Sequence, residues 1–411
     1  MVLNYIWVSF FIIGFVVALI KLIFFQDTEV FPAMLQSTFD NARTGFEISI
    51  GLTGVMSLWL GLMRIGEKGG MVPILSRIVG PFFSRLFPEI PKNHPATGSI
   101  IMNFSANILG LDNAATPLGL KAMNELQEIN PNKDVASNAQ IMFLVLNASG
   151  LTIIPISILA DRAILGSVDP TSIFIPTLLA TYFSTFFGLL YVCIRQRINL
   201  LDPVLLAYIF GVTAVIGATM YHFYGLPPEE IKKQSSLATG IIIFTIIVCF
   251  IILGLRKRVH IFETFVEGAK EGFNTSIRII PFLIGILVAI GVFRTSGTLK
   301  YIEEGIGMAV GAAGLDTDFV PAIPVALLKP LTGQGARSMM IEVTKAHGGP
   351  DAFVGQVASI MRGCAETTLY LLALYFGSVS VRNTRYAVTG GLIADFTGAI
   401  AGIIIAYIFF H

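Results

Sequence analysis

The chain has 411 residues, of which 54% are hydrophobic and only 13% are charged, and its formal net charge is +1 at pH 7. Apolar runs long enough to cross hydrocarbon recur along it, which excludes a soluble globular protein. Lys and Arg occur only in short groups, so the clustered positive charge of a nucleic-acid-binding protein is missing. The sequence predicts an all-α, multi-pass membrane protein that has the lipid bilayer as its solvent.

The first apolar run extends from Tyr5 to Phe25, with no basic segment before it and no small-residue cleavage site after it. A retained helix is therefore expected rather than a signal peptide. Further apolar runs follow at 45–63, 139–160, 172–193, 203–222, 237–255, 274–293, 354–376 and 387–410.

Two other stretches, 97–120 and 319–341, are interrupted by Gly, Pro and polar residues. In a membrane, such backbone persists only where protein shields it or where it lines a watery cavity. We expect each stretch to enter the membrane and return to the same side as a re-entrant or broken-helix hairpin. Together with the apolar runs this predicts nine full crossings.

Matching segments recur at similar spacing in the two halves of the chain. The pairs are 39–49 with 266–276, Gly70 with Gly297, and 148–152 with 364–368. Such repetition is typical of transporters built from two related halves. The predicted domains are an N-terminal helix and linker (1–39), a first repeat (40–197), two linking helices (198–260) and a second repeat (261–411).

Loop charges indicate that the second repeat is inverted relative to the first. Residues 64–96 hold five basic and two acidic side chains, whereas 294–320 hold two basic and four acidic ones. The turn at 161–171 likewise differs in sign from its counterpart at 378–386. Because cytoplasmic loops carry the excess of Lys and Arg, the paired loops are expected on opposite sides of the membrane.

A hairpin tip near mid-membrane leaves backbone groups free to bind a polar solute. We therefore predict a substrate site from polar residues at the two tips and on the helices that follow them. In the first repeat these are Asn103, Asn107, Asp112, Asn113, Thr116 and Asn147, with Ser105, Ser149 and Thr152 nearby, and in the second Lys329, Thr332, Gln334, Arg337, Glu366 and Thr367, with Ser338, Arg362 and Thr368 nearby.

The charged members of this set allow more than one interpretation. Lys329 and Arg337 can bind solute or form structural ion pairs. Asp112 and Glu366 can be their partners, or can hold a coupling ion, because a carboxylate in a low dielectric readily takes up a proton. Asp395 also lies within an apolar run.

Catalytic and metal-binding patterns are not evident. The three cysteines lack CxxC spacing, the histidines are scattered singly, and no nucleotide-binding or nucleophile motif occurs. No cofactor, metal or enzymatic activity is predicted. Asp112 with Glu366 is the one pair that an enzyme hypothesis could use.

The segment 103–117, NFSANILGLDNAATP, resembles the signature of spore maturation protein A, and 329–337 and 364–370 resemble spore maturation protein B. The chain thus resembles the two proteins fused end to end. Both are similar to a wider group with a nucleoside-recognition, or gate, domain, found also in concentrative nucleoside transporters and ferrous-iron transporters. In the nucleoside transporters a Gly-Gln-Thr-Glu run binds ligand. Here Gly333-Gln334 is similar, but Gly335, Ala336 and Arg337 follow.

The resemblance implies a secondary transporter of the inner or plasma membrane that moves a small polar or anionic solute by alternating access. Arg337 favours a carboxylate such as dipicolinate, whose movement is associated with related gate-domain proteins, over a neutral nucleoside. Without an ATP-binding motif, active transport would be coupled to H⁺ or Na⁺. The alternative is a non-transporting membrane scaffold in envelope or spore maturation. A homo-oligomer is left open.

Overall fold

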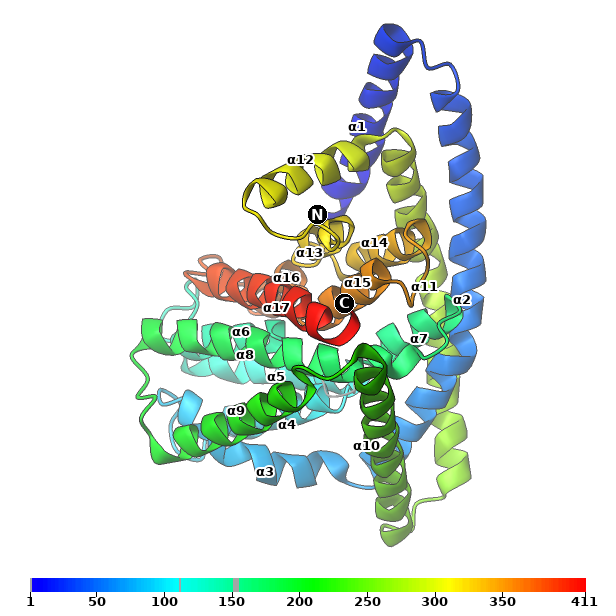
Figure 1. Cartoon of the computed structure of the whole chain (residues 1–411). Coiled ribbons are helices and arrows are strands. Elements are labelled where there is room, and N and C mark those ends of the chain that lie inside the picture. Colours follow the sequence, from blue (N-terminus) through cyan, green and yellow to red (C-terminus); the bar gives the residue numbers. More distant parts are fainter. Residues whose placement is uncertain (1, 111, 151–154) are drawn as a thin grey trace.

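The computed structural model describes residues 2–110, 112–150 and 155–411, and almost all of them are helical (Figure 1). Eight candidate spans in this part of the chain are long and apolar enough to cross a membrane, which confirms the predicted all-α polytopic fold. The predicted run at 139–160 contains two shorter helices, α6 (Asn138–Ala148) and α7 (Ile156–Ile164). They flank residues 151–154, outside the described part.

The α-helices of the two halves follow in a corresponding order, whereas the 3₁₀ turn precedes the last helix in the first half and the third helix in the second. The first half contains α2 (Val30–Lys68), α3 (Met71–Leu86), α4 (Pro95–Ile108), α5 (Asp112–Ile129), α6, α7, the 3₁₀ turn η1 (Pro170–Ile173) and α8 (Phe174–Gln196). The second contains α11 (Ile261–Thr295), α12 (Thr298–Ala312), η2 (Val320–Ala322), α13 (Ile323–Leu328), α14 (Gly333–Ala346), α15 (Phe353–Gly363), α16 (Thr368–Ser378) and α17 (Ala387–Phe410). Outside the repeats lie α1 (Val2–Phe25), α9 (Pro203–Phe223) and α10 (Pro228–Arg256).

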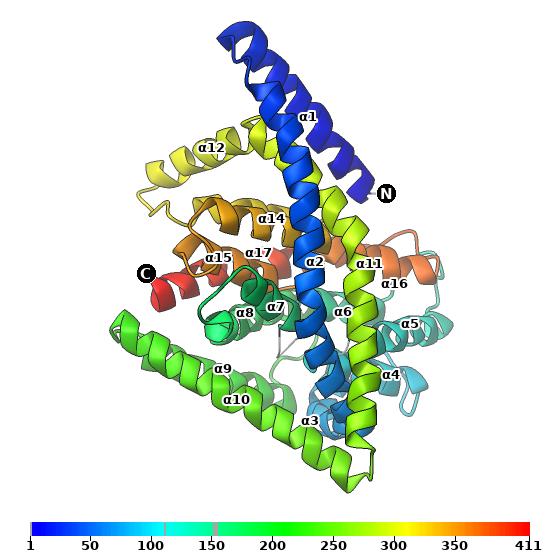
Figure 2. The ribbon, with the colours of Figure 1, turned by 90° about the vertical axis from the view of Figure 1, so that its right-hand side faces the viewer.

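The long helices α2 and α11 run side by side in opposite directions along one side of the molecule (Figure 2). Gly45, in the first part of α2, faces Ile284 in the last part of α11, and Gly61 faces Phe265 near the start of α11. The corresponding helices of the two repeats are therefore antiparallel, as an inverted repeat requires.

Matched glycines let these two helices touch backbone to backbone. A Cβ added to Gly272 would lie 2.6 Å from the carbonyl oxygen of Met56, and one added to Gly45 would lie 3.0 Å from the Cα of Ile284. Small residues drive this kind of close helix packing in lipid, where burial of apolar surface supplies little force. The contact thus depends on glycine at equivalent positions of both repeats.

The last helices of the repeats pair in the same way. Gly188 of α8 lies against Ala394 of α17, and Gly398 of α17 lies against Ser184 of α8, so the two helices are antiparallel. In addition, Gly70 and Gly297, which the sequence predicts to correspond, both have a left-handed backbone, with φ of 86° and 90°. Each of them directly precedes an amphipathic helix. These equivalences support the inverted repeat.

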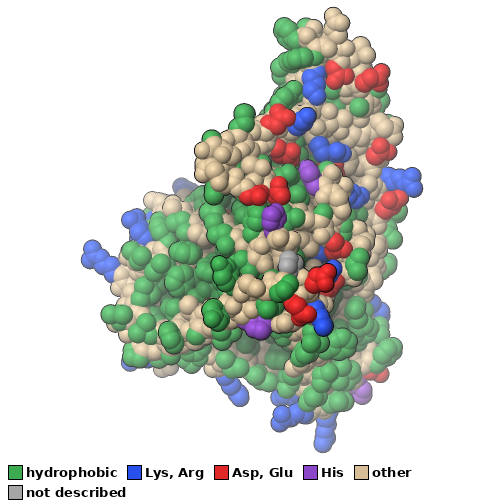
Figure 3. Space-filling view, in the orientation of Figure 1, with side chains coloured by type: hydrophobic (Ala, Val, Ile, Leu, Met, Phe, Trp, Pro, Cys, Tyr) green, Lys and Arg blue, Asp and Glu red, His purple; other side chains and the backbone are tan. Residues whose placement is uncertain are grey.

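The shorter helices of both repeats pack on one face of the α2–α11 pair, and α9 and α10 lie at the outside (Figures 1 and 2). Hydrophobic side chains cover much of the lower and left part of the face in Figure 3, where α8, α9 and α17 lie. Exposed aromatic side chains on the linking helices include Phe210 and Phe244. Such a surface suits contact with lipid acyl chains.

Loops of the two repeats bind each other at both ends of the short helices. After α5, the carbonyl oxygen of Asp134 accepts hydrogen bonds from the backbone N–H groups of Arg382 and Asn383, after α16. After α14, the Asp351 carboxylate accepts from the N–H of Val168, at 2.7 Å, and pairs with Arg162 at 2.9 Å. The repeats are thus connected on both sides of the region between them.

One predicted loop has a different position. The turn expected at 161–171 begins later, because Asp161 and Arg162 belong to α7 and are buried. Arg162 is tolerated there because its guanidinium donates to Asp351, Ser167, Ser172 and the carbonyl of Pro350. Because its hydrogen-bond donors all have acceptors of this kind, a charged residue such as Arg162 can lie inside a helix and need not indicate a loop.

Replacing Gly272 with Ala should destabilise the protein by about 1–3 kcal/mol, because the new methyl group meets backbone atoms of α2 that cannot move independently. The control is Gly54→Ala, also in the α2–α11 pair, where a Cβ meets nothing within 4 Å. That change should leave stability unchanged or raise it by up to about 1 kcal/mol. Thermal unfolding of both variants in detergent measures the difference. Equal unfolding temperatures would contradict the proposed contact.

Candidate functional site

Four interruptions of helix meet in the region between the repeats. Two are hairpin tips, between α4 and α5 and between α13 and α14, and two are the breaks between α6 and α7 and between α15 and α16. The sequence predicts the two tips from their Gly, Pro and polar residues, but it predicts 139–160 and 354–376 as continuous apolar runs, so the two breaks are found only in the structure. The structure adds which of them touch.

Asparagine side chains join the first tip to the first helix break. The Asn107 amide donates to Asn147 Oδ1 at 2.8 Å and to Asn103 Oδ1 at 3.3 Å, and the Asn103 amide donates to the carbonyl of Ala115 at 2.8 Å. The Tyr375 hydroxyl of the second repeat approaches Asn147 Oδ1 to 3.5 Å. These uncharged groups hold the first tip in place.

The two helix breaks touch through their backbones. The N–H of Glu366 donates to the carbonyl of Ala148 at 2.8 Å. Beside this bond Gly150 has φ +71°, and a Cβ there would lie 2.8 Å from the Cα of Ala365. Glycine is needed at this position for both reasons. The bond connects the first repeat directly to the second.

The second tip places two helix N-termini next to each other. Thr332 caps α14 by accepting from the N–H of Gly335 at 3.2 Å. The N–H of Leu369, in the first turn of α16, donates to the carbonyl of Pro330 at 3.0 Å, and a Cβ on Gly333 would lie 2.9 Å from Thr367 Oγ1. Because each helix N-terminus carries partial positive charge, this pair favours a bound anion.

Two cations lie beside these N-termini. Lys329 is 3% exposed, donates to the carbonyl of Arg362, and lies within Coulombic range of Glu366 and Asp395. Arg362 is half-buried, its Nε is buried without a hydrogen-bond partner, and none of the carboxylates that the structure describes forms an ion pair with it. Glu366 is the exposed member of this group. We define Lys329, Arg362, Glu366 and Thr367 as the second-tip cluster.

Arg337 has a different environment from the one expected. Its guanidinium makes a bidentate ion pair with Asp161 of α7, at 2.5–3.0 Å, and the two side chains are 4% and 1% exposed. The pair connects α14 of the second repeat to α7 of the first. Of the two interpretations of Arg337, the structure favours the structural ion pair, with Asp161 as its partner.

The remaining predicted residues divide between described and undescribed positions. Thr116 is half-buried in α5, and Gln334 is half-buried with its Oε1 enclosed and without a partner among the described groups. The side chains of Asp112 and Asn113 lie outside the described part of the structure, as does Thr152.

Sequence reasoning missed Asp161 and Tyr375 as neighbours of the site. Asp161 directly follows the apolar run 139–160 and is followed by Arg162. Two adjacent charged residues at the end of an apolar run indicate a loop rather than a buried ion pair. Tyr375 lies in an apolar helix, where an aromatic residue gives no signal of its own. Its hydroxyl group, directed at Asn147, shows its role only in three dimensions.

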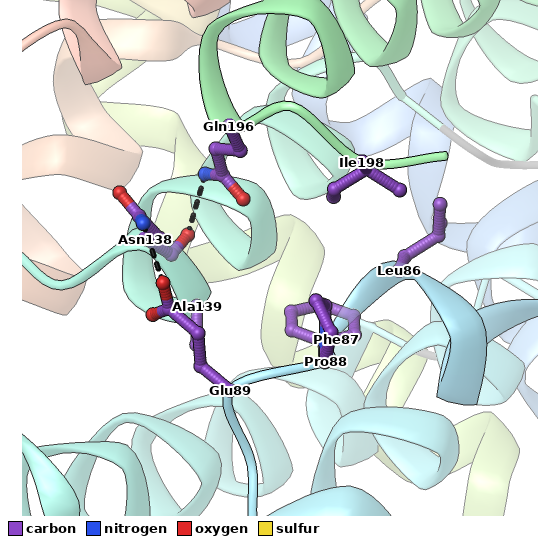
Figure 4. A pocket seen from close by; sticks show the side chains of 8 residues that line it. All are labelled: Leu86, Phe87, Pro88, Glu89, Asn138, Ala139, Gln196 and Ile198. Atoms are coloured by element: carbon purple, nitrogen blue, oxygen red, sulfur yellow. Dashed lines mark hydrogen bonds between the residues drawn. The ribbon is translucent and has the colours of Figure 1, made fainter. Parts of the chain in front are cut away.

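A separate pocket lies between the end of α3, the start of α6 and the end of α8 (Figure 4). The Asn138 amide donates to Glu89 at 2.5 Å, and the Gln196 amide donates to the Asn138 carbonyl at 2.8 Å. The cavity volume is about 20 Å³, enough for one water molecule. The pocket is therefore a hydrogen-bonded junction rather than a solute site.

The fold and the paired tips define a multi-pass α-helical membrane protein made of two inverted halves. A family model described as nucleoside recognition (Gate) matches residues 49–223. Spore maturation protein A of Bacillus subtilis (strain 168) is 44% identical over 181 residues, which are 44% of this chain and 89% of the relative. Spore maturation protein B of the same strain is 42% identical over 181 residues, 44% of this chain and 98% of the relative. The chain belongs to the family of spore maturation proteins A and B.

Asp161→Ala should destabilise the protein by about 3–5 kcal/mol, because it leaves the Arg337 guanidinium buried and unpaired. The double variant Asp161→Leu/Arg337→Met should recover most of this loss, since it removes both charges and retains volume. Thermal unfolding of the single and double variants in detergent measures the coupling. The exposed pair Arg43–Glu47 serves as the control, and Glu47→Gln should leave the unfolding temperature unchanged. Losses that simply add in the double variant would refute the coupling.

Proposed function

We propose that this protein is a secondary transporter that moves a small anionic solute across the cell's inner or plasma membrane by alternating access. The observation that carries the proposal is the pair of helix N-termini, α14 and α16, beside Lys329 and the unpaired guanidinium of Arg362. A carboxylate or phosphate group bound there would be stabilised by the partial positive charge of both N-termini and would accept hydrogen bonds from Lys329 and Arg362.

The unpaired guanidinium of Arg362 favours an anion over a neutral nucleoside. Arg337 is already neutralised by Asp161, but Arg362 has no such partner among the described residues. An Arg in a partly buried position is costly unless an anion pairs with it, and Arg binds planar carboxylates in bidentate fashion. Gln334, whose Oε1 has no described partner, would add specificity for a donor group on the solute.

The inverted repeat supplies a route to alternating access. Contacts between the repeats lie on both sides of the tips, Asp134 with the loop after α16 at one end and Asp351 with α7 and Val168 at the other. Lys329, Thr332 and Thr367 are buried between them. Opening one set of contacts while the other stays closed would expose the cluster to one side at a time.

The alternative is a membrane scaffold that uses the same fold to bind a partner and moves no solute. A scaffold differs from a transporter in one measurable respect, because it moves no solute across the membrane. It also has no need of a buried cation. The experiment below separates the two. The proposed partners are the solute and the bilayer, and a homo-oligomer remains compatible with either.

Lys329→Met should lower solute exchange by about 10- to 100-fold, because it removes one or two charge-assisted hydrogen bonds to the anion. Exchange of labelled dipicolinate, and separately of labelled uridine, is measured in proteoliposomes that contain the full chain. Size-exclusion profiles and unfolding temperatures establish that the variant is folded. The control is Lys121→Met, because Lys121 is 65% exposed on α5 and outside the cluster.

Exchange of dipicolinate but not of uridine by the native protein, lost in Lys329→Met and retained in Lys121→Met, supports an anion transporter. Exchange of uridine alone would refute the anion class. Folded native protein that exchanges neither probe above empty liposomes would favour the scaffold.

A further inference from the structure

Asp395 is a buried carboxylate in the middle of the last helix, α17, and it is only half satisfied. It is 4% exposed, and its Oδ2 accepts a hydrogen bond from the Thr368 hydroxyl at 2.6 Å. Its Oδ1 is enclosed and has no hydrogen-bond partner among the described residues. A buried carboxylate with a single hydroxyl donor carries a large desolvation cost while it is ionised.

The groups that face Asp395 come from the second tip and the second helix break. Lys329, Glu366 and the Cys364 thiol lie within Coulombic range. Lys329 donates to the carbonyl of Arg362 and forms no ion pair with Asp395 in the described structure. On the opposite side, α8 and α6 present small, hydroxyl and aliphatic side chains, with Gly188 against Ala394 and Val145 against Gly390. The carboxylate therefore has one cation, Lys329, and one other carboxylate, Glu366, nearby, but no direct counter-charge among the described residues.

Thr368 connects this carboxylate to the proposed anion site. It is the first residue of α16, whose N-terminus lies beside that of α14. An ionised Asp395 therefore places negative charge at the positive end of α16, where the solute anion would bind. It also repels any anion that pairs with Lys329 or Arg362. Protonation of Asp395 removes both effects.

We propose that Asp395 carries the coupling proton of this transporter, an inference that rests on the proposed function. A proton from one side of the membrane binds the Asp395 carboxylate, the anion binds the second-tip cluster, and both leave on the other side. The proton and the anion cross together, so one negative charge is offset by one positive charge. No further reactant is required.

Thermodynamic linkage makes the two binding events mutually supportive. If protonation of Asp395 raises the affinity for the anion by some factor, the bound anion raises the proton affinity of Asp395 by the same factor. One linked proton changes anion affinity by up to about tenfold per pH unit. Anion affinity should therefore rise as the pH falls.

The test compares exchange with accumulation in proteoliposomes that contain the full chain, with labelled dipicolinate as the probe. Exchange needs no driving ion, whereas accumulation against a gradient does. In the native protein, an inward proton gradient should drive accumulation. Asp395→Asn, which imitates the protonated state, should retain exchange, lose proton-driven accumulation and bind the probe with an affinity independent of pH. Glu47→Gln, an exposed carboxylate on α2, should behave like the native protein.

Thr368→Val provides a second variant in case Asp395→Asn does not fold. It removes the hydroxyl donor that stabilises the ionised carboxylate, so the midpoint of the pH dependence of uptake should move to higher pH. An unchanged midpoint would overturn the assignment of Asp395.

The outcomes separate this inference from the proposed function. Proton-driven accumulation by Asp395→Asn at the native level would refute the role of Asp395 and leave the transporter intact. Accumulation driven by a sodium gradient at equal pH, without a proton requirement, would refute it as well. A native protein that does not exchange the probe at all would refute the proposed function, and this inference with it.

Discussion

The structure depends on one requirement of the bilayer, that an interrupted helix must find partners for its freed backbone groups within the protein. Here each repeat breaks its helices twice, and the freed groups find partners both within their own repeat and across the repeat boundary. The bond from the Glu366 N–H to the Ala148 carbonyl is the central case. This bond exists only when the two halves fold against each other, because each repeat supplies one of its partners.

Close packing of the long helices brings the helix breaks of the two repeats into contact. The antiparallel pairs α2–α11 and α8–α17 approach through glycine at Gly45, Gly272, Gly188 and Gly398. The α2–α11 pair runs along one side of the molecule, and the α8–α17 pair lies among the short helices that carry the tips (Figures 1 and 2). Buried ion pairs then fix the orientation of the repeats, with Arg337 of one bound to Asp161 of the other.

Much of this arrangement could be predicted from the sequence, because apolar runs, loop charge and repeated glycine are local signals. The two hairpin tips can be located from Gly, Pro and polar residues, whereas the breaks at α6–α7 and α15–α16 lie in apolar runs that the sequence predicts as continuous. The correspondence of Gly70 with Gly297 has a structural basis in their shared left-handed backbone. The partners of buried charges could not be predicted in this way. Asp161 and Arg337 are far apart in the sequence and meet only after both repeats have folded, so nothing near either residue indicates the other. The extent of α2 was also underestimated, since polar residues such as Arg43 and Glu47 lie on its exposed face and pair with each other.

The linking helices α9 and α10 have a consequence for assembly. They join the two halves in one polypeptide, so the halves are always present in equal number and their encounter is intramolecular. The effective concentration of one half around the other is then set by the length of the link and does not fall when the protein is dilute. Contacts that would be too weak to hold two separate chains together at low abundance can therefore hold these halves together. This leaves the contacts between the repeats free to be modest in strength, as the proposed alternating access would require.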